Sequence, residues 1–178
     1  MTIYYATGMV REDPRFENLE TTQYENAKWE EKHKRGNALF YFCSLVEEMA
    51  RLSSNSNVDI VNLLGAKAID EILNNAELLH NQKLQTAAQK MLKKYSVKSS
   101  NYSLEKFSEV PSSYTFADPV SKVVLYIVEK DKISEAQAIT NFYNSPIMEL
   151  INNFDVEMHL SNVQYVYESY KAKRALEY

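Results

Sequence analysis

The sequence has little cysteine, glycine or proline, and it has no long apolar run. Among its 178 residues Cys43 is the single cysteine, which excludes an internal disulfide framework and a four-cysteine zinc site. No apolar run approaches the length of a membrane span, and the N-terminus lacks the basic-then-apolar pattern of a secretion signal. With only three glycines and four prolines, the chain is predicted to form long helices joined by short polar turns.

Composition and charge narrow the class of protein further. The chain is 45% hydrophobic and 25% charged, close to the average for globular domains, and its length suffices for one domain or two very small ones. A formal net charge of −4 argues against a protein that coats nucleic acid through a bulk positive field. We therefore expect a cytoplasmic, all-α protein that does not contact a membrane.

The N-terminal region is predicted to hold an arm and a polar helix. Residues 2–20 show no helical period, and we interpret them as an irregular arm with a candidate strand at Ile3–Ala6. Thr22 and Glu25 have the spacing of a capping box, which predicts the start of a polar helix. Gly36 is the expected end of that helix, because glycine is the residue that most often terminates one.

Residues 37–52 are apolar at nearly every position, which predicts a helix surrounded by other helices at the centre of the core. The exceptions fall on one narrow stripe with helical spacing: Ser44, Glu47, Glu48 and Arg51. We expect this stripe to be the exposed face of the helix, with Arg51 paired to Glu47 and Glu48. A carboxylate pair poised in a cleft is the alternative interpretation.

Further helices in the first half are predicted from apolar periods near 3.6. They cover 57–65, which Asn57 caps, then 66–75 and 82–95. Residues 96–117 lose the helical period. A connection of that length indicates either a functional loop or a boundary between two halves.

The second half is predicted to hold four helices, each with a recognisable first residue. These are Asp118 before Pro119, Ser134, Ser145 before Pro146, and Ser161 in a capping box with Gln164. The last helix is expected to bury one stripe, made of Val163, Val166, Tyr167 and Tyr170.

The two halves of the chain resemble each other. The segment IDEILNN at 69–75 matches IMELINN at 147–153, and a histidine follows each copy, His80 in the first and His159 in the second. This pattern predicts an internal duplication in which two related helical units pack about a pseudo-two-fold axis. The predicted division is an arm and polar helix over 1–36, a first unit over 37–95, a crossover loop over 96–117 and a second unit over 118–178.

Both copies carry a family resemblance. The second copy, ISEAQAITNFYNSPIMELINNFDVEMHLSNVQYVYESY, resembles a family of small bacterial helical proteins of unknown function. The first copy, ALFYFCSLVEEMARLSSNSNVDIVNLLGAKAIDEILNNAELLH, is similar to a related family. In bacterial genomes the family that the second copy resembles tends to sit beside proteins resembling ADP-ribosyltransferases, in gene clusters laid out like toxin–antitoxin pairs. The resemblance implies a toxin-neutralising or accessory partner, and it transfers no catalytic motif.

Histidine and acidic side chains are the candidates for an enzymatic site. If the duplication places the two histidines at equivalent positions, they meet across the pseudo-axis as an acid–base couple or as metal ligands. This alternative site consists of His80, His159, Glu47, Glu48 and Arg51. The interpretation that we favour is structural, with each histidine capping a helix or bonding a turn carbonyl.

The remaining histidine and the cysteine are not expected to react. His33 lies in the charged segment EEKHKR and is predicted to face solvent. Cys43 lies within the apolar helix and has no nearby base, so we expect a buried, inert thiol with a raised pKa.

Lysines cluster with aromatic residues towards the middle of the chain. Aromatic rings can stack on unpaired bases while lysines follow the phosphates, so a nucleic-acid surface is one interpretation. Its residues would be Lys90, Lys93, Lys94, Tyr95 and Lys98, with Tyr102, Lys106 and Phe107 beyond them. We prefer a solvated helix face, because the rest of the chain is acidic.

Tyrosine is abundant, with 13 residues, and it suits interface anchors because it combines a large area with few rotatable bonds. We therefore predict a non-enzymatic module, without cofactor or metal, that binds a protein partner such as the product of an adjacent gene. The expected contact residues are Tyr4, Tyr5, Tyr165 and Leu176. A homodimer through the same residues is the alternative.

Overall fold

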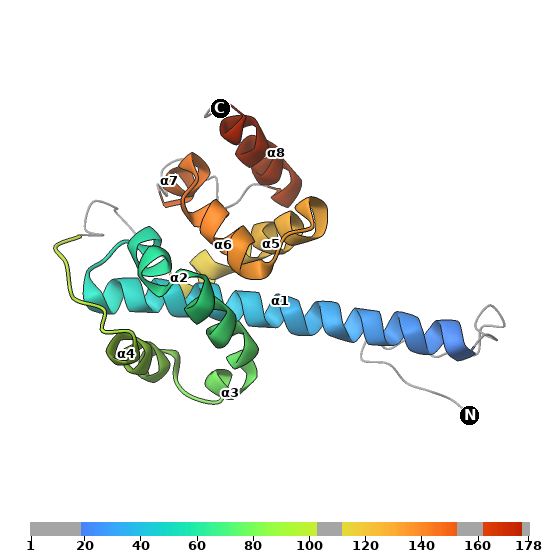
Figure 1. Ribbon diagram of the computed structural model, residues 1–178, viewed down its shortest axis with the longest axis horizontal. Helices are drawn as coiled ribbons and strands as arrows, with labels where there is room; N and C mark the ends of the chain where they lie inside the picture. Colours follow the sequence, from blue (N-terminus) through green and yellow to red (C-terminus); the bar gives the residue numbers. More distant parts are fainter. Residues whose placement is uncertain (1–18, 103–111, 153–161, 176–178) are drawn as a thin grey trace. The chain divides into compact units, whose positions relative to one another are not determined.

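A computed structural model describes residues 19–102, 112–152 and 162–175 (Figure 1). In these ranges the chain forms eight helices and no strand, which confirms the all-α prediction. The chain divides into two compact units, Met1–Arg35 and Gly36–Tyr178. Every buried core side chain in the described ranges lies between Leu39 and Tyr170, within the second unit.

Helix α1, Leu19–Ser53, is continuous, so the predicted end at Gly36 is wrong. A glycine inside a helix costs only about 1 kcal/mol relative to alanine, which the surrounding helix formers offset. The helix ends instead at Ser54, whose positive φ of 50° turns the chain out of the helix. Thr22 lies inside α1 rather than at its start, so the predicted capping box is also wrong.

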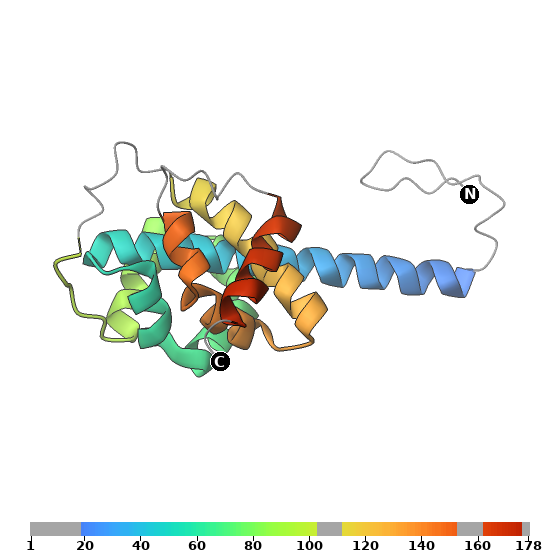
Figure 2. The same ribbon diagram turned by 90° about the horizontal axis from the view of Figure 1, so that it is seen from above.

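The C-terminal half of α1 forms the centre of the core, as its apolar composition predicts. Side chains from Leu39 to Ala50 are buried around nearly the whole circumference of the helix. Within the second unit, this part of α1 lies between α3 and α4 on one side and α5–α8 on the other (Figures 1 and 2).

Helix α2, Asn57–Asn74, joins the two helices that were predicted over 57–65 and 66–75. Its kink lies at Gly65, where φ is 66° and ψ is 169°, a conformation almost restricted to glycine. The N-cap is Ser56, in a capping box with Asp59, rather than the predicted Asn57. Asn57 is buried and takes part in tertiary hydrogen bonds instead.

Two short helices complete the first half. They are α3, Ala76–His80, and α4, Leu84–Lys94, the second of which lies within the predicted range 82–95. The predicted apolar face of α4 is buried at Leu84, Ala87, Ala88 and Met91.

Helix α5, Ser113–Asp131, begins five residues before the predicted Asp118. The Ser112 side chain accepts a hydrogen bond from the Thr115 amide and caps the helix, and Pro119 lies inside it. The earlier start buries Phe116 and Ala117, which lengthens the apolar face against the core.

The last three helices follow the prediction closely. They are α6, Glu135–Tyr143, capped by Ser134, then α7, Pro146–Asn152, and α8, Val163–Arg174. The N-cap of α8 is Asn162, whose side chain accepts a hydrogen bond from the Gln164 amide, rather than the predicted Ser161, which lies outside the described residues. Val166 and Tyr170 are buried, and Val163 and Tyr167 pack partly buried against the core.

The two halves meet through α2 and α6, which pack against each other. In the second half, α5 packs against α6 and α8, and α7 against α8. The predicted duplication and its pseudo-two-fold axis remain predictions. In the described ranges no helix is both long enough and apolar enough to cross a membrane.

Candidate functional site

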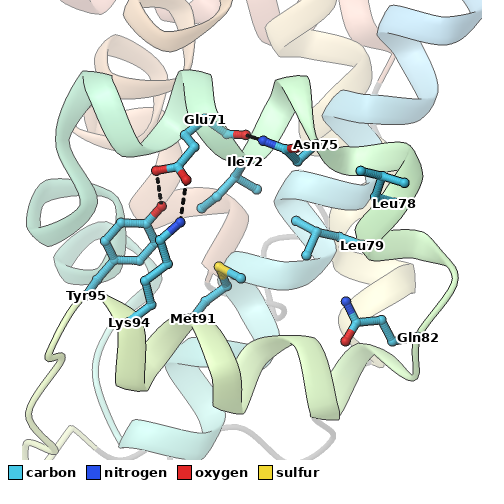
Figure 3. Close-up of a pocket in the computed structure, with 9 residues that line it drawn as sticks. All are labelled: Glu71, Ile72, Asn75, Leu78, Leu79, Gln82, Met91, Lys94 and Tyr95. Carbon is cyan, nitrogen blue, oxygen red and sulfur yellow. Dashed lines mark hydrogen bonds and ion pairs between the residues drawn. The ribbon is translucent and has the colours of Figure 1, made fainter.

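A hollow of about 280 Å³ lies between α2, α3 and α4 (Figure 3). Ile72 from α2, Leu79 from α3 and Met91 from α4 point towards one another and form its apolar floor. Small-molecule and cofactor sites usually enclose roughly 300–1,000 Å³. The hollow is therefore of a size for one or two apolar side chains.

The rim on the α2 side is a closed set of polar contacts. The Glu71 carboxylate accepts hydrogen bonds from the Lys94 ammonium and, at 3.1 Å, from the Tyr95 hydroxyl (Figure 3). The hydrogen bond from Lys94 is the largest cause that holds the pKa of Glu71 below its usual value, followed by the bond from Tyr95. Glu71 is therefore a stable carboxylate in an ion pair, which makes it unsuitable as a general acid near neutral pH.

Leu78 lies at the open edge of the hollow and is 69% exposed. Helix α3 has only five residues, and Ala76 and Leu79 face the core, so Leu78 points outwards. The buried Tyr41 fixes this arrangement from α1, because its hydroxyl donates a 3.0 Å hydrogen bond to the Leu79 carbonyl. An aliphatic side chain is thus held at the surface beside an apolar floor.

The polar stripe on α1 is not exposed, which corrects the prediction. Ser44 and Glu47 are buried, and Glu48 and Arg51 are half-buried. The predicted pair is present, since Arg51 donates two hydrogen bonds to one oxygen of Glu47 at 3.1 and 3.0 Å. Ser113 from α5 donates to Glu48 at 2.8 Å. The stripe is buried because helices of both halves cover it.

The buried carboxylate of Glu47 belongs to a network that joins the two halves. Asn57 donates to its second oxygen at 3.3 Å and to the Asn152 side chain of α7 at 2.9 Å. Asn152 donates back to Asn57 at 3.2 Å. With each of these side chains hydrogen-bonded, the network holds helices of the two halves in register.

Cys43 is fully buried, as predicted, and burial raises the pKa of its thiol to about 12. Burial also raises the pKa of Tyr143 well above 10, and the neighbouring Cys43 and the Glu47 charge add to this. The Tyr143 hydroxyl makes no hydrogen bond of normal geometry, so the Cys43 thiol lies near it without bonding to it. Both groups are neutral and sealed in the core, and neither can act as a nucleophile.

The described histidines do not form a reaction centre. His80 is exposed, and its ring packs edge-on against the Tyr41 ring with 5.5 Å between the ring centroids. His159 lies outside the described residues. His33 is exposed, as predicted, and its ring lies 3.8 Å from that of Trp29. In the part of the chain that the structure describes, no three histidine, cysteine or acidic side chains are placed to hold a metal ion.

The predicted lysine cluster is exposed, and part of it surrounds the hollow. Lys90, Lys93, Lys94 and Lys98 all face solvent, while Tyr95 is half-buried and bonded to Glu71. Lys90 donates a 2.6 Å hydrogen bond to Gln82, another residue of the rim. Lys106 and Phe107 lie outside the described residues.

Of the predicted partner-contact residues, the structure describes only Tyr165, which is 59% exposed on α8. Tyr4, Tyr5 and Leu176 lie outside the described ranges, as does the candidate strand at Ile3–Ala6.

No protein-family model, no curated protein and no solved structure matches this chain. The family resemblance and the genomic setting that it implies therefore remain expectations.

Sequence reasoning did not single out Leu78, Leu79 and Ile72 as members of a site. The available signal was the pair of adjacent leucines in the segment AELLH. Adjacent side chains of a helix point about 100° apart, and helix α3 packs with Leu79 inwards, which leaves Leu78 facing solvent. Which of the two faces solvent, and what lies beside it, depends on where α4 packs.

Proposed function

We propose that this chain is a non-enzymatic module that binds a protein partner by receiving an apolar side chain in the hollow between α2, α3 and α4. The observation that carries the proposal is Leu78, a large aliphatic side chain that is 69% exposed beside an apolar floor. Leu78 and the apolar floor beside it together offer area that a partner can remove from water, and burial of a large aliphatic side chain contributes about 1.5–3 kcal/mol.

The absence of reactive groups at the hollow supports binding over catalysis. Its single carboxylate, Glu71, is engaged with Lys94 and Tyr95. In the alternative site predicted from the sequence, Glu47 and Glu48 are hydrogen-bonded to Arg51 and Ser113, whereas His80 is exposed to solvent. A role as a toxin-neutralising or accessory partner is the finer form of the proposal, and its support is the family resemblance alone.

The test is recovery of a partner by the tagged full-length protein from its own cells, with the product of an adjacent gene as the first candidate. Leu78→Glu is expected to lower the recovery of one specific protein at least about tenfold, because it places a charge where an apolar side chain is received. Leu63→Glu is the matched control, since Leu63 is also an exposed leucine, at 58%, but does not line the hollow.

Two results would contradict this assignment of the site. The first is a partner that is recovered equally with both glutamate variants. The second is a partner lost with Tyr165→Ala and kept with Leu78→Glu, which would move the binding surface to α8.

A further inference from the structure

We infer that the partner segment received by the hollow is an acidic amphipathic helix, whose apolar side chain fits over Leu78 while its carboxylates run along α4. This inference rests on the proposed function and adds the chemistry of the partner. The basis is the charge of α4 and the way its lysines lie relative to the hollow.

The sequence around α4 has positive charge only. From Leu78 to Leu104 there is no aspartate or glutamate, and this stretch holds five lysines in a chain whose net charge is −4. Acidic side chains near the hollow lie on the opposite wall, with Asp70 and Glu71 on α2 and Glu77 on α3. The α4 wall is therefore the side that favours a partner's carboxylates.

The lysines of α4 lie on the correct side of the helix. Lys90 and Lys94 are four residues apart in α4, which places them in one row beside Met91 on the floor. Lys94 is already paired with Glu71, so Lys90 carries the charge that a partner meets. Lys93 lies roughly 200° from Met91 around the helix, on the far side. Lys90 is held towards the hollow by its bond to the neutral Gln82 amide, and that bond leaves its charge uncancelled.

The floor favours a protein over nucleic acid as the occupant. It is aliphatic, and the one aromatic ring at the rim, Tyr95, is half-buried with its hydroxyl bonded to Glu71. Single-stranded nucleic acid draws its affinity from exposed stacking rings together with a continuous basic groove. Apolar anchors flanked by charges are instead the features that helix-in-groove partners use.

The experiment is a selection from a displayed library of random peptides of about 14 residues, which span roughly 21 Å as helices. Binders to the full-length protein are kept only if they fail to bind Leu78→Ser, a neutral variant that removes the apolar side chain without repelling acidic peptides. The enriched peptides are expected to have net negative charge and a leucine, isoleucine, methionine or phenylalanine with helical spacing from the acidic residues.

A representative peptide is then measured by fluorescence anisotropy. Lys90→Glu is expected to raise its Kd about tenfold, equivalent to 1.4 kcal/mol. Lys93→Glu, the matched control on the far side of α4, is expected to change it much less. Raising the salt concentration should weaken binding to the wild-type protein and have less effect on Lys90→Glu.

The outcomes separate the inference from the proposed function. Enriched peptides that are neutral or basic overturn the acidic partner and leave the binding module supported. If no peptide distinguishes the wild-type protein from Leu78→Ser, both are overturned. A single-stranded RNA probe that loses affinity with Lys90→Glu but not with Leu78→Glu overturns the inference in favour of nucleic acid, and a dimer abolished by Leu78→Glu overturns it in favour of a second copy.

Discussion

At the scale of single residues, burial decides which polar groups can react. Cys43 and Glu47 occupy the same helix; the sequence predicts an inert thiol for Cys43 and leaves a catalytic carboxylate open as the alternative for Glu47. The thiol is kept neutral by burial, and the carboxylate is bound by Arg51 and Asn57. Polar side chains in this core therefore serve the packing of helices, and the available surface chemistry lies at the hollow.

The raised pKa of Cys43 predicts a loss of stability in alkali. Its pKa is about 12 in the folded protein against 9.0 without burial, so the folded state keeps a proton that the unfolded state loses. This contribution is complete below pH 9 and is lost as the pH rises from 9 towards 12. At pH 10 the free energy of unfolding is lower by about 1 kcal/mol.

Urea denaturation at pH 8 and pH 10 measures this effect, with Cys43→Ala as the control. Tyrosines with raised pKa values, such as Tyr41, destabilise both proteins equally on going to pH 10. The stability advantage of the wild-type protein over the variant should therefore shrink by about 1 kcal/mol. An advantage that is the same at the two pH values would show that the thiol is not buried.

At the scale of helices, two glycines have opposite roles although both lie within helical segments. Gly65 has a positive φ and makes the kink of α2, whereas Gly36 is an ordinary helical residue of α1. Beyond the kink, Glu71 and Ile72 of α2 line the hollow together with Met91 and Lys94 of α4 (Figure 3).

Alanine substitutions distinguish the two glycines. Gly65→Ala is expected to lower the free energy of unfolding by about 1–3 kcal/mol, because alanine is strained in that backbone conformation although the space for its methyl group is open. Gly36→Ala should raise it by about 0.5–1 kcal/mol, since the new methyl group meets only Leu125 at an ordinary 3.9 Å. Urea unfolding followed by circular dichroism measures both. A neutral Gly65→Ala would mean that α2 is not kinked there.

At the scale of the whole molecule, the second unit contains a complete core. The buried apolar side chains of the described ranges run from Leu39 to Tyr170, with α2 and α6 packed across its middle. A unit with its own core is expected to fold without the rest of the chain.

Truncation tests this independence. A fragment of residues 36–178 should keep its helical circular dichroism and unfold in one transition with the urea midpoint of the full chain. A fragment of residues 36–162 loses the buried Val166 and Tyr170, and we expect it to lose cooperative unfolding. An unfolded 36–178 fragment would show that residues before Gly36 are needed for the core.

The sequence by itself determined that the protein is all-α and that residues 37–52 lie at its centre. Sparse glycine and proline and an almost uninterrupted apolar segment are local properties, and so is the cap of α6 at Ser134, the predicted first residue that the structure confirms. Only the tertiary structure decided that Glu47 is buried, because that depends on Asn57 and Asn152 approaching from other helices. The same holds for the hollow at Leu78, which exists because α4 packs beside α2 and α3, an arrangement of segments that no local pattern encodes.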